Sequence, residues 1–501
     1  MEQINGFFVY ESQPTQLTNP DDKVRRTKAG TKNHRRLLSA DGPNLLRMMS
    51  NDRPELCRPL VRHMTTIDSS KEAVVITDPY STGCVVASEV MKRGFSVIAL
   101  WTKDISDELR YHTPLSCSGM NEFFATIEEK DDLMATMEEI YNVAGTKKIV
   151  ACFAGGEIGV DLADRLSERM KLRTNGTKHF NRRDKKVQQE IIRKHGLRSV
   201  RQAGGAEFSE VEEFLKTESY PVVLKPNEAA GSEGVKLCNS FEEAKEHFEA
   251  LMASQLQVGG PCPSVLCQEF LRGKEYVIDH VSRDGIHKTT MLWSYDKRPL
   301  NGSDFVYFGT LPVDANSPEA KILIPYVRGI LDAMEIANGA SHAEVMMTPN
   351  GPCLVEMNVR AHGGDGNWVP LASALTGGYT QVDATVDCYL DKQKFATIPD
   401  VYPSPFNAAG QEVYLVSRGR GKVRFTPGFE VIRSLPSFVY LETGVMPGGY
   451  VDFTVDLFTA IGSVMLMHKD PAVVDADIKK IREMEANNEI IEYEPQLATL
   501  K

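Results

Sequence analysis

Apolar and polar residues alternate through two short runs in residues 342–364, HAEVMMTPNGPCLVEMNVRAHGG. This period of two predicts two strands, and the Pro-Asn-Gly-Pro segment between them predicts the turn of a β-hairpin. If the odd-numbered apolar residues share one face, Glu344 lies about opposite Glu356. A two-residue loop centred on Asn350 and Gly351 would break this pairing, so we expect a bulge or a three-residue loop.

The polar face of this hairpin carries Glu344, Glu356, Asn358 and Arg360. Two opposed carboxylates repel each other, and a divalent cation would resolve the conflict, because Mg²⁺ prefers hard oxygen ligands. Arg360, one pleat further along, would then face the anion that the metal presents. An ordinary solvated hairpin face is the alternative, and the hairpin alone does not separate the two.

Upstream of the hairpin, strands alternate with helices. Short apolar runs at residues 73–77, 95–101 and 148–153 are typical of buried strands, and a helical pattern extends to Met91 after the first run. This alternation predicts a parallel α/β sheet. The turn after the first strand holds one glycine instead of Gly-x-Gly-x-x-Gly, which does not favour a dinucleotide site.

The middle of the chain combines an amphipathic helix with paired strands. Residues 181–196 predict a helix with Lys185 in its first turn, and Lys225 ends the next apolar run. The small loop at 229–234, AAGSEG, is flexible enough for backbone N–H groups to approach phosphate oxygens. A plain hairpin loop is the alternative. The chain contains no Gly-x-x-x-x-Gly-Lys-Ser/Thr, which disfavours a P-loop NTPase.

A further helix is predicted over residues 241–254 and a strand over 264–270. The backbone at 269–271, Glu-Phe-Leu, can offer one C=O and one N–H to an adenine edge, with apolar side chains against the ring. Glu275 follows after a glycine turn. From about residue 403 the chain shows short strands and a charged helix.

Composition places the chain among ordinary globular proteins. It has 501 residues, 42% of them hydrophobic and 25% charged, which is enough for several domains. A net charge of -11 argues against nucleic acid as the main partner. No apolar run has the length of a membrane span, and the start lacks the features of a signal peptide. Nine scattered cysteines without Cys-x-x-Cys indicate a reducing compartment, so we expect a cytoplasmic protein.

In this order, these parts resemble the ATP-grasp superfamily. The parts are a lysine in a helix, a lysine closing a strand, a small glycine loop, Glu-x-apolar before Gly-x-Glu-Tyr, and Glu…Glu-x-Asn-x-Arg. The segments GKEYVIDHVSRDG and WSYDK and the hairpin look most like the amino-acid ligase branch, the bacilysin- and carnosine-type dipeptide synthetases. The resemblance implies an α/β fold class with α+β lobes, an ATP-grasp fold preceded by a Rossmann-like parallel-sheet domain.

The resemblance also divides the chain into four parts. They are a polar N-terminal extension at 1–70, a Rossmann-like domain at 71–180, an ATP-grasp domain at 181–400 with a mobile lid at about 205–272, and a C-terminal lobe at 401–501. A homodimer is expected from the family.

Roles for individual residues are carried over from the family by position. ATP would be bound by Lys185, Lys225, Gly231, Ser232, Gly234, Glu269, Phe270, Leu271 and Glu275. Two Mg²⁺ ions, or Mn²⁺ in their place, would be held by Glu344, Glu356 and Asn358. Catalysis would involve Arg360 and Glu275. Residues that could line the substrate pocket, or equally serve packing and surface, are His280, Trp293, Tyr295, Lys297, Gly363, Gly364 and Trp368.

The implied reaction is ATP-dependent amide formation between small molecules, an amino-acid or other carboxylate and an amine. ATP would phosphorylate the carboxylate and the amine would attack the acyl phosphate, releasing ADP and phosphate. One alternative is a biotin-carboxylase-like carboxylase, which shares the Glu…Glu-x-Asn-x-Arg end. Another is an ATP-binding protein without turnover, against which the intact carboxylates and arginine count.

Overall fold

The computed structural model describes residues 71–112, 114–117, 122–179, 182–227, 234–256 and 260–495. The predicted extension at 1–70 and the loop residues Gly231 and Ser232 lie outside these ranges. Within the described ranges, none of the helices combines the length and hydrophobicity that a membrane span requires. The division into four domains, the cytoplasmic location and the homodimer stay predictions.

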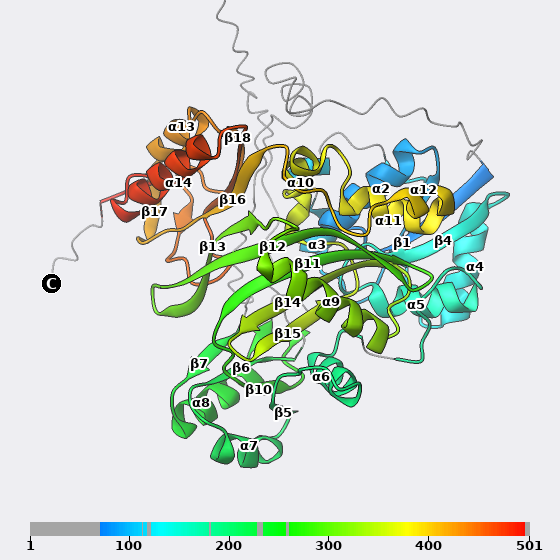
Figure 1. Cartoon of the computed structure of the whole chain (residues 1–501), viewed down its shortest axis with the longest axis horizontal. Helices are drawn as coiled ribbons and strands as arrows, with labels where there is room; N and C mark the ends of the chain where they lie inside the picture. The colour runs from blue at the N-terminus through cyan, green and yellow to red at the C-terminus, as the bar shows by residue number, and fades with distance from the viewer. Residues whose placement is uncertain are drawn as a thin grey trace, which may run out of the picture. The chain divides into compact units, whose positions relative to one another are not determined.

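A four-stranded parallel sheet, in the order β3-β2-β1-β4, confirms the predicted parallel α/β arrangement (Figure 1). Its core strands are apolar at nearly every position because helices pack against the sheet. The strands are β1 (Glu72–Thr77), β2 (Ser96–Trp101), β3 (Ala125–Glu128) and β4 (Lys148–Ala154). The helices are α2 (Thr82–Lys92), α3 (Asp107–Tyr111), α4 (Leu133–Ala144) and α5 (Val160–Arg169).

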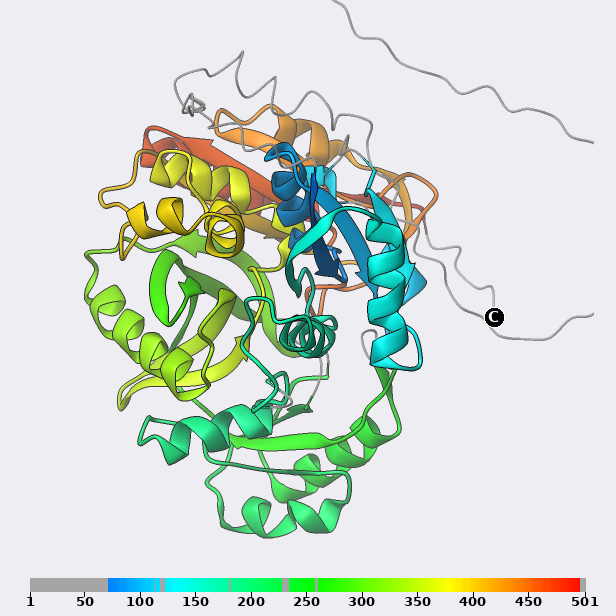
Figure 2. The ribbon, with the colours of Figure 1, turned by 90° about the vertical axis from the view of Figure 1, so that its right-hand side faces the viewer.

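A second, antiparallel sheet in the order β5-β10-β6-β7 forms the unit that we call the lid sheet, drawn at the bottom of Figures 1 and 2. Strands β6 and β7 pair on either side of the predicted glycine loop. The strands are β5 (Gln202–Gly205), β6 (Val222–Pro226), β7 (Lys236–Cys238) and β10 (Val265–Glu269), with a short pair β8 (Gln255–Leu256) and β9 (Gly260–Pro261) nearby in sequence. The helices are α6 (Lys185–Lys194), which precedes the sheet, α7 (Glu212–Thr217) and α8 (Phe241–Met252).

The largest element is an eight-stranded antiparallel sheet, the main sheet, in the order β15-β14-β11-β12-β13-β16-β20-β18. Its strands are β11 (Lys274–Arg283), β12 (Ile286–Leu300), β13 (Ser303–Pro312), β14 (Gly339–Thr348), β15 (Gly351–Asn358), β16 (Ala409–Leu415), β18 (Phe438–Glu442) and β20 (Gly462–His468). One hydrophobic core joins this sheet to the parallel sheet, so the two share packing rather than folding around separate cores.

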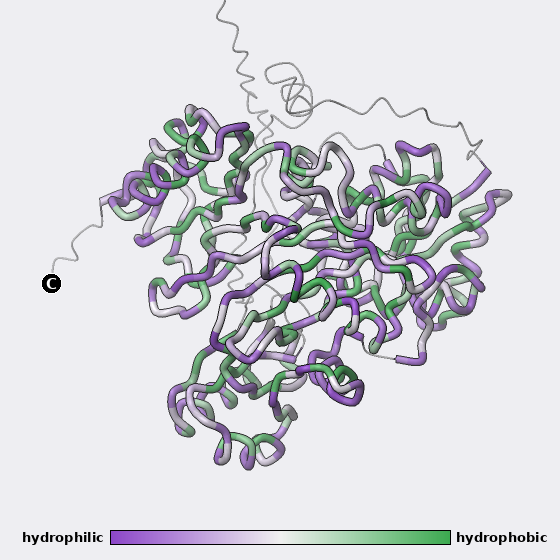
Figure 3. The backbone as a smooth tube through the Cα atoms, viewed as in Figure 1, coloured by the Kyte–Doolittle hydropathy of each residue, from purple (hydrophilic) through white to green (hydrophobic). Residues whose placement is uncertain are grey.

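The remaining helices surround the main sheet. These are α9 (Pro318–Ala333), α10 (Val369–Thr376), α11 (Gln381–Leu390), α12 (Lys392–Thr397), α13 (Pro427–Arg433) and α14 (Pro471–Ala486). A small sheet in the order β19-β17-β21 completes the C-terminal part, with β17 (Gly421–Phe425), β19 (Tyr450–Val451) and β21 (Glu492–Tyr493). In Figure 3 helices such as α14 alternate between hydrophilic and hydrophobic residues, as expected of helices that bury one face.

The β14–β15 hairpin has the predicted pairing, with Glu344 opposite Glu356. The loop itself contains only Pro349 and Asn350, because Thr348 pairs with Gly351. A register shift after Glu344 supplies the bulge that the sequence requires, so the expectation of a bulge is confirmed. The bulge restores even-to-even pairing and thereby brings the two carboxylates to the same face.

Candidate active site

A cleft of about 910 Å³, including its solvent-open mouth, separates the lid sheet from the main sheet. Its lid side is formed by Val223, Lys225, Pro226, Val235, Gln268, Glu269, Phe270 and Leu271. Its other side is formed by Lys185, Glu275, Lys297, Phe305, Tyr307, Glu344, Met346, Leu354, Val355 and Glu356. Apolar walls with a few convergent charges are typical of a small-molecule site.

Both predicted phosphate-binding lysines reach this cleft. Asp184 caps α6 by accepting from the backbone N–H of Val187, and Lys185 is the first residue of that helix. The Lys185 Nζ lies 3.0 Å from Oε2 of Glu356. Burial, together with the charge of Lys185, lowers the pKa of Lys225 to about 8. Two cations held close together in a buried cleft favour a polyanion between them.

The predicted metal ligands lie together on one face of the hairpin. Asn358 follows Glu356 by one pleat, and its Nδ2 donates to Glu356 Oε1 at 3.2 Å, which leaves its amide oxygen available as a ligand. With Glu344 directly opposite Glu356, the donor set is two carboxylates and one amide oxygen. This set of hard oxygen donors fits Mg²⁺.

Glu275 and Lys297 extend the charged face to the next two strands. The Lys297 Nζ lies 2.9 Å from Oε1 of Glu275, and both side chains are largely buried. Burial raises the pKa of Glu275, which also shares a hydrogen bond with Glu344. Burial opposes ionisation of Glu344 as well, but the hydrogen bond from His342 and the charge of Lys297 hold its pKa below the usual range.

The predicted adenine hinge lies at the end of β10, where Phe270 and Leu271 line the cleft. The Glu269 carboxylate is engaged elsewhere, since Arg198 and Arg201 form ion pairs with it at 3.0 Å and 2.8 Å. The backbone N–H of Glu269 also donates within the protein, to the carbonyl oxygen of Arg201 at 3.0 Å, so the adenine hinge stays a prediction that Phe270 and Leu271 would have to carry.

Arg360 connects the hairpin to the parallel sheet. Its Nε lies 3.1 Å from Oε2 of Glu157, which follows β4, and Arg183 approaches the other oxygen of Glu157 at 3.5 Å. Sequence reasoning did not single out Glu157. The available signal was its position after Gly155 and Gly156, just beyond the carboxyl end of a parallel strand, where sites in α/β sheets gather.

The residues predicted for the substrate pocket do not all lie at the cleft. Lys297 lines the cleft, and the Tyr295 ring packs edge-on against Tyr307 at 5.2 Å between centroids. His280 lies on the opposite face of β11, where its Nε2 contacts Thr289 Oγ1 at 3.0 Å and burial lowers its pKa to about 3.

Three other members of that set lie beneath or within the loop after Arg360. The indole Nε1 of Trp368 donates to the carbonyl oxygen of Gly363 at 3.0 Å, and its ring is buried, so Trp368 supports this loop from below. Gly364 adopts a φ of +67°, a left-handed conformation that favours glycine. Trp293 is fully buried. Neither tryptophan lines the cleft between the two sheets.

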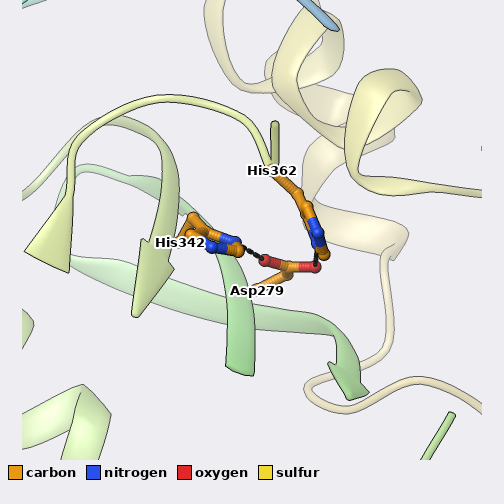
Figure 4. A group of neighbouring side chains, drawn as sticks. All are labelled: Asp279, His342 and His362. Atoms are coloured by element: carbon orange, nitrogen blue, oxygen red, sulfur yellow. Dashed lines mark hydrogen bonds and ion pairs between the residues drawn. The ribbon is translucent and has the colours of Figure 1, made fainter. Parts of the chain in front are cut away.

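Asp279, His342 and His362 form a buried group that the sequence analysis did not predict (Figure 4). The group lies beside the carboxylate of Glu344. Asp279 Oδ1 accepts from Nδ1 of His342 at 3.0 Å, and Oδ2 accepts from Nδ1 of His362 at 2.9 Å. Burial disfavours a charged His342, yet hydrogen bonds to Asp279 and Glu344 raise its pKa to about 9. The sequence signal was the alternation of β11, which places Asp279 on the same face as Glu275.

Comparison with protein families identifies one match within the chain. Residues 183–365 match the model described as phosphoribosylglycinamide synthetase, ATP-grasp (A) domain. The match begins just before Lys185 and ends just after the Gly363–Gly364 loop, so it covers the cleft and the hairpin.

Similar proteins extend over most of the chain. Dapdiamide A synthase of Enterobacter agglomerans is 27% identical over 426 residues, 84% of this chain and 98% of that protein. The L-amino acid ligase of Bacillus licheniformis superposes with a TM-score of 0.64 at 15% identity, over 85% of this chain and 99% of the other. The biotin carboxylase domain of Hydrogenobacter thermophilus 2-oxoglutarate carboxylase, solved with MgADP and bicarbonate, superposes with a TM-score of 0.56 at 14% identity, over 84% and 90%.

Proposed function

Because this chain is an ATP-grasp protein related to the carboxylate–amine ligases, we propose that it forms an amide bond between an amino-acid carboxylate and an amine, with ATP as the energy source. The observation that carries this function is the cleft between the two antiparallel sheets, where the buried Lys185 and Lys225 lie among the paired carboxylates of Glu344 and Glu356. The products would be ADP, phosphate and an amide, and a dipeptide is the product that we propose.

The two sheets would share the nucleotide between them. The base would lie against the apolar wall near Phe270, Leu271 and Met346, with the triphosphate directed toward Lys185 and Lys225. Glu344, Glu356 and Asn358 would hold two Mg²⁺ ions, and we propose that Mn²⁺ can replace them. The bound metal would offset the charge of the transferring phosphoryl group.

The chain's own residues would supply positioning and charge. Lys225 would face the α-phosphate, and Arg360 would neutralise the acyl phosphate formed from the carboxylate substrate. Glu275 and Lys297 would fix the position of Glu344 through the hydrogen bond and ion pair described above.

Two alternatives are less well supported. A biotin-carboxylase-like carboxylase has the same fold, but the sequence relative matched over 98% of its length is a dapdiamide A synthase. An ATP-binding protein without turnover would not need both metal carboxylates and the arginine, so the presence of Glu344, Glu356 and Arg360 in the chain counts against it.

The test measures nucleotide products with ATP and Mg²⁺ across amino acids supplied singly and in pairs. ADP release that requires a particular acid and amine supports the ligase and names its substrates. AMP release would overturn the acyl-phosphate route in favour of adenylation. ADP release that depends on bicarbonate instead would support the carboxylase.

A further inference from the structure

The proposed reaction needs a group that removes a proton from the amine substrate, and none of the roles proposed above supplies one. An amino group is mostly protonated at neutral pH, and an ammonium ion has no lone pair with which to attack an acyl phosphate. Arg360 keeps its charge and cannot accept this proton, and Lys185 and Lys225 are proposed to serve as cations that hold the phosphates. Resting on the proposed function, we infer that His362 is the general base that removes a proton from the amine substrate.

Asp279 fixes the tautomer that this role requires. An ionised carboxylate can only accept hydrogen bonds, so the 2.9 Å contact means that Nδ1 of His362 carries the hydrogen. Asp279 also accepts from the indole of Trp293 at 2.8 Å, and it is itself fully buried, which holds its position. The lone pair of the neutral His362 ring must therefore lie on Nε2, the nitrogen that points away from Asp279.

The Nε2 of His362 is left available to a ligand. Among the described residues none forms a hydrogen bond with it, and 7% of the surface of the His362 side chain remains exposed. The residue as a whole is 6% exposed, which means that the ring is buried except at an edge. Stacking on Trp368 at 5.2 Å between ring centroids fixes the plane of the imidazole.

His362 also has the right location in the chain. His362 lies two residues after Arg360, which is proposed to face the acyl phosphate. It immediately precedes Gly363. Its backbone N–H donates to Oε1 of Gln381 at 2.8 Å, so backbone and side chain are both anchored. An amine that approaches the acyl phosphate beside Arg360 would pass the open edge of this ring.

The surrounding charges keep His362 neutral and ready to accept a proton. Burial lowers the pKa of His362, Asp279 opposes this effect, and His342 and Arg360 add to it. These three groups, from β11, β14 and the segment after β15, are the charged neighbours of the ring. The neutral form is the one that can act as a base.

The step balances as follows. The ammonium group transfers one proton to Nε2 of His362, and the free amine attacks the carbonyl carbon of the acyl phosphate. The new C–N bond forms, the C–O bond to phosphate breaks, and the second nitrogen proton leaves with the phosphate as HPO₄²⁻. His362 returns its proton to solvent, so the net products are amide, HPO₄²⁻ and H⁺.

The test compares two nucleophiles on the variant His362→Asn. The asparagine amide can still donate to Asp279, but it cannot accept a proton. An amino acid needs deprotonation, whereas hydroxylamine is already unprotonated at neutral pH and yields a hydroxamate from the same acyl phosphate. We expect amide formation with the amino acid to fall about 10²- to 10⁴-fold while hydroxamate formation changes less than about threefold. A rise of amide formation with pH, about tenfold per unit as more amine is free, is also expected in the variant.

Matched variants separate this role from a structural one. His468→Asn, at the end of β20, should leave both reactions unchanged, and His362→Gln repeats the test with a longer side chain. Equal loss of hydroxamate and amide, or full retention of amide formation, would overturn the inference while leaving the ligase intact. A wild-type protein that forms neither product would overturn the proposed function, and this inference with it.

Discussion

The ammonium group of Lys185, the first residue of α6, lies 3.0 Å from a carboxylate oxygen of Glu356 in β15. A predicted phosphate-binding lysine thus neutralises a predicted metal ligand. A bound triphosphate would offer the lysine another partner and free the carboxylate, so nucleotide and metal should bind together.

Lys185→Met should therefore have opposite effects on the two ligands. Without the lysine, Glu356 is left unneutralised, and Mg²⁺ should bind the nucleotide-free protein several-fold more tightly. ATP affinity should fall about tenfold, because a charged contact to phosphate is lost. Isothermal titration of the variant with Mg²⁺ alone and with ATP measures both affinities. A parallel loss of the two affinities would contradict the coupling between nucleotide and metal binding.

Glu356→Gln should leave a folded protein whose Mg²⁺-dependent turnover falls at least about 100-fold, since a neutral amide is a poorer ligand than a carboxylate. ADP release at several Mg²⁺ concentrations is the measurement. Glu138→Gln, an exposed change on α4, is the control and should keep normal turnover. Substantial activity in the Glu356 variant would place the metal elsewhere.

Lys225 gives ATP binding a pH dependence. Its pKa in the nucleotide-free protein is lowered to about 8, so the ammonium form is lost as pH rises through that value. ATP affinity should be full below pH 8 and decline above it. Lys225→Arg, which stays charged, should remove the decline, and Lys225→Met should weaken binding at every pH. ATP titrations of the three proteins from pH 6.5 to 9.5 measure these affinities. An unchanged ATP affinity in the methionine variant would mean that the phosphates bind elsewhere.

The buried Glu275–Lys297 pair should be costly to break one residue at a time. Lys297→Met leaves the Glu275 carboxyl without its 2.9 Å partner, and we expect a loss of about 3 kcal/mol in the free energy of unfolding. The double variant with Glu275→Gln should be less destabilised than the sum of the two single variants. Urea unfolding of all four proteins gives the coupling energy, and simple additivity would show that the pair contributes nothing.

Glu412 should make the protein less stable at higher pH. Burial raises its pKa to about 8, whereas the unfolded chain ionises it near its usual value of about 4.3. Between these values the folded state retains a proton that the unfolded state has lost, so this residue's contribution to stability falls as pH rises from about 4.3 to 8. Glu412→Gln should raise the melting temperature, relative to wild type, by several degrees more at pH 8 than at pH 5. Equal differences at both pH values would contradict the shift.

Much of the fold could be predicted from local patterns. The parallel strands near residues 73–77 and 148–153 are short apolar runs, and the hairpin pairing of Glu344 with Glu356 followed from period-two alternation alone. These features depend on neighbours in sequence, which one chain displays directly. Strand β3, only four residues long and half exposed, has no such pattern and was not predicted.

The sequence by itself determined the order of the parts, the strand faces and the opposed carboxylates, because periodicity and turn chemistry act over a few residues. Only the tertiary structure decided which face of β11 meets the cleft, and hence that Asp279 joins the site while the adjacent His280 packs on the far side. It also brought Glu157 into an ion pair with Arg360, which lies 203 residues further along the chain. Such contacts depend on how separate sheets pack against each other, and no local pattern carries that information.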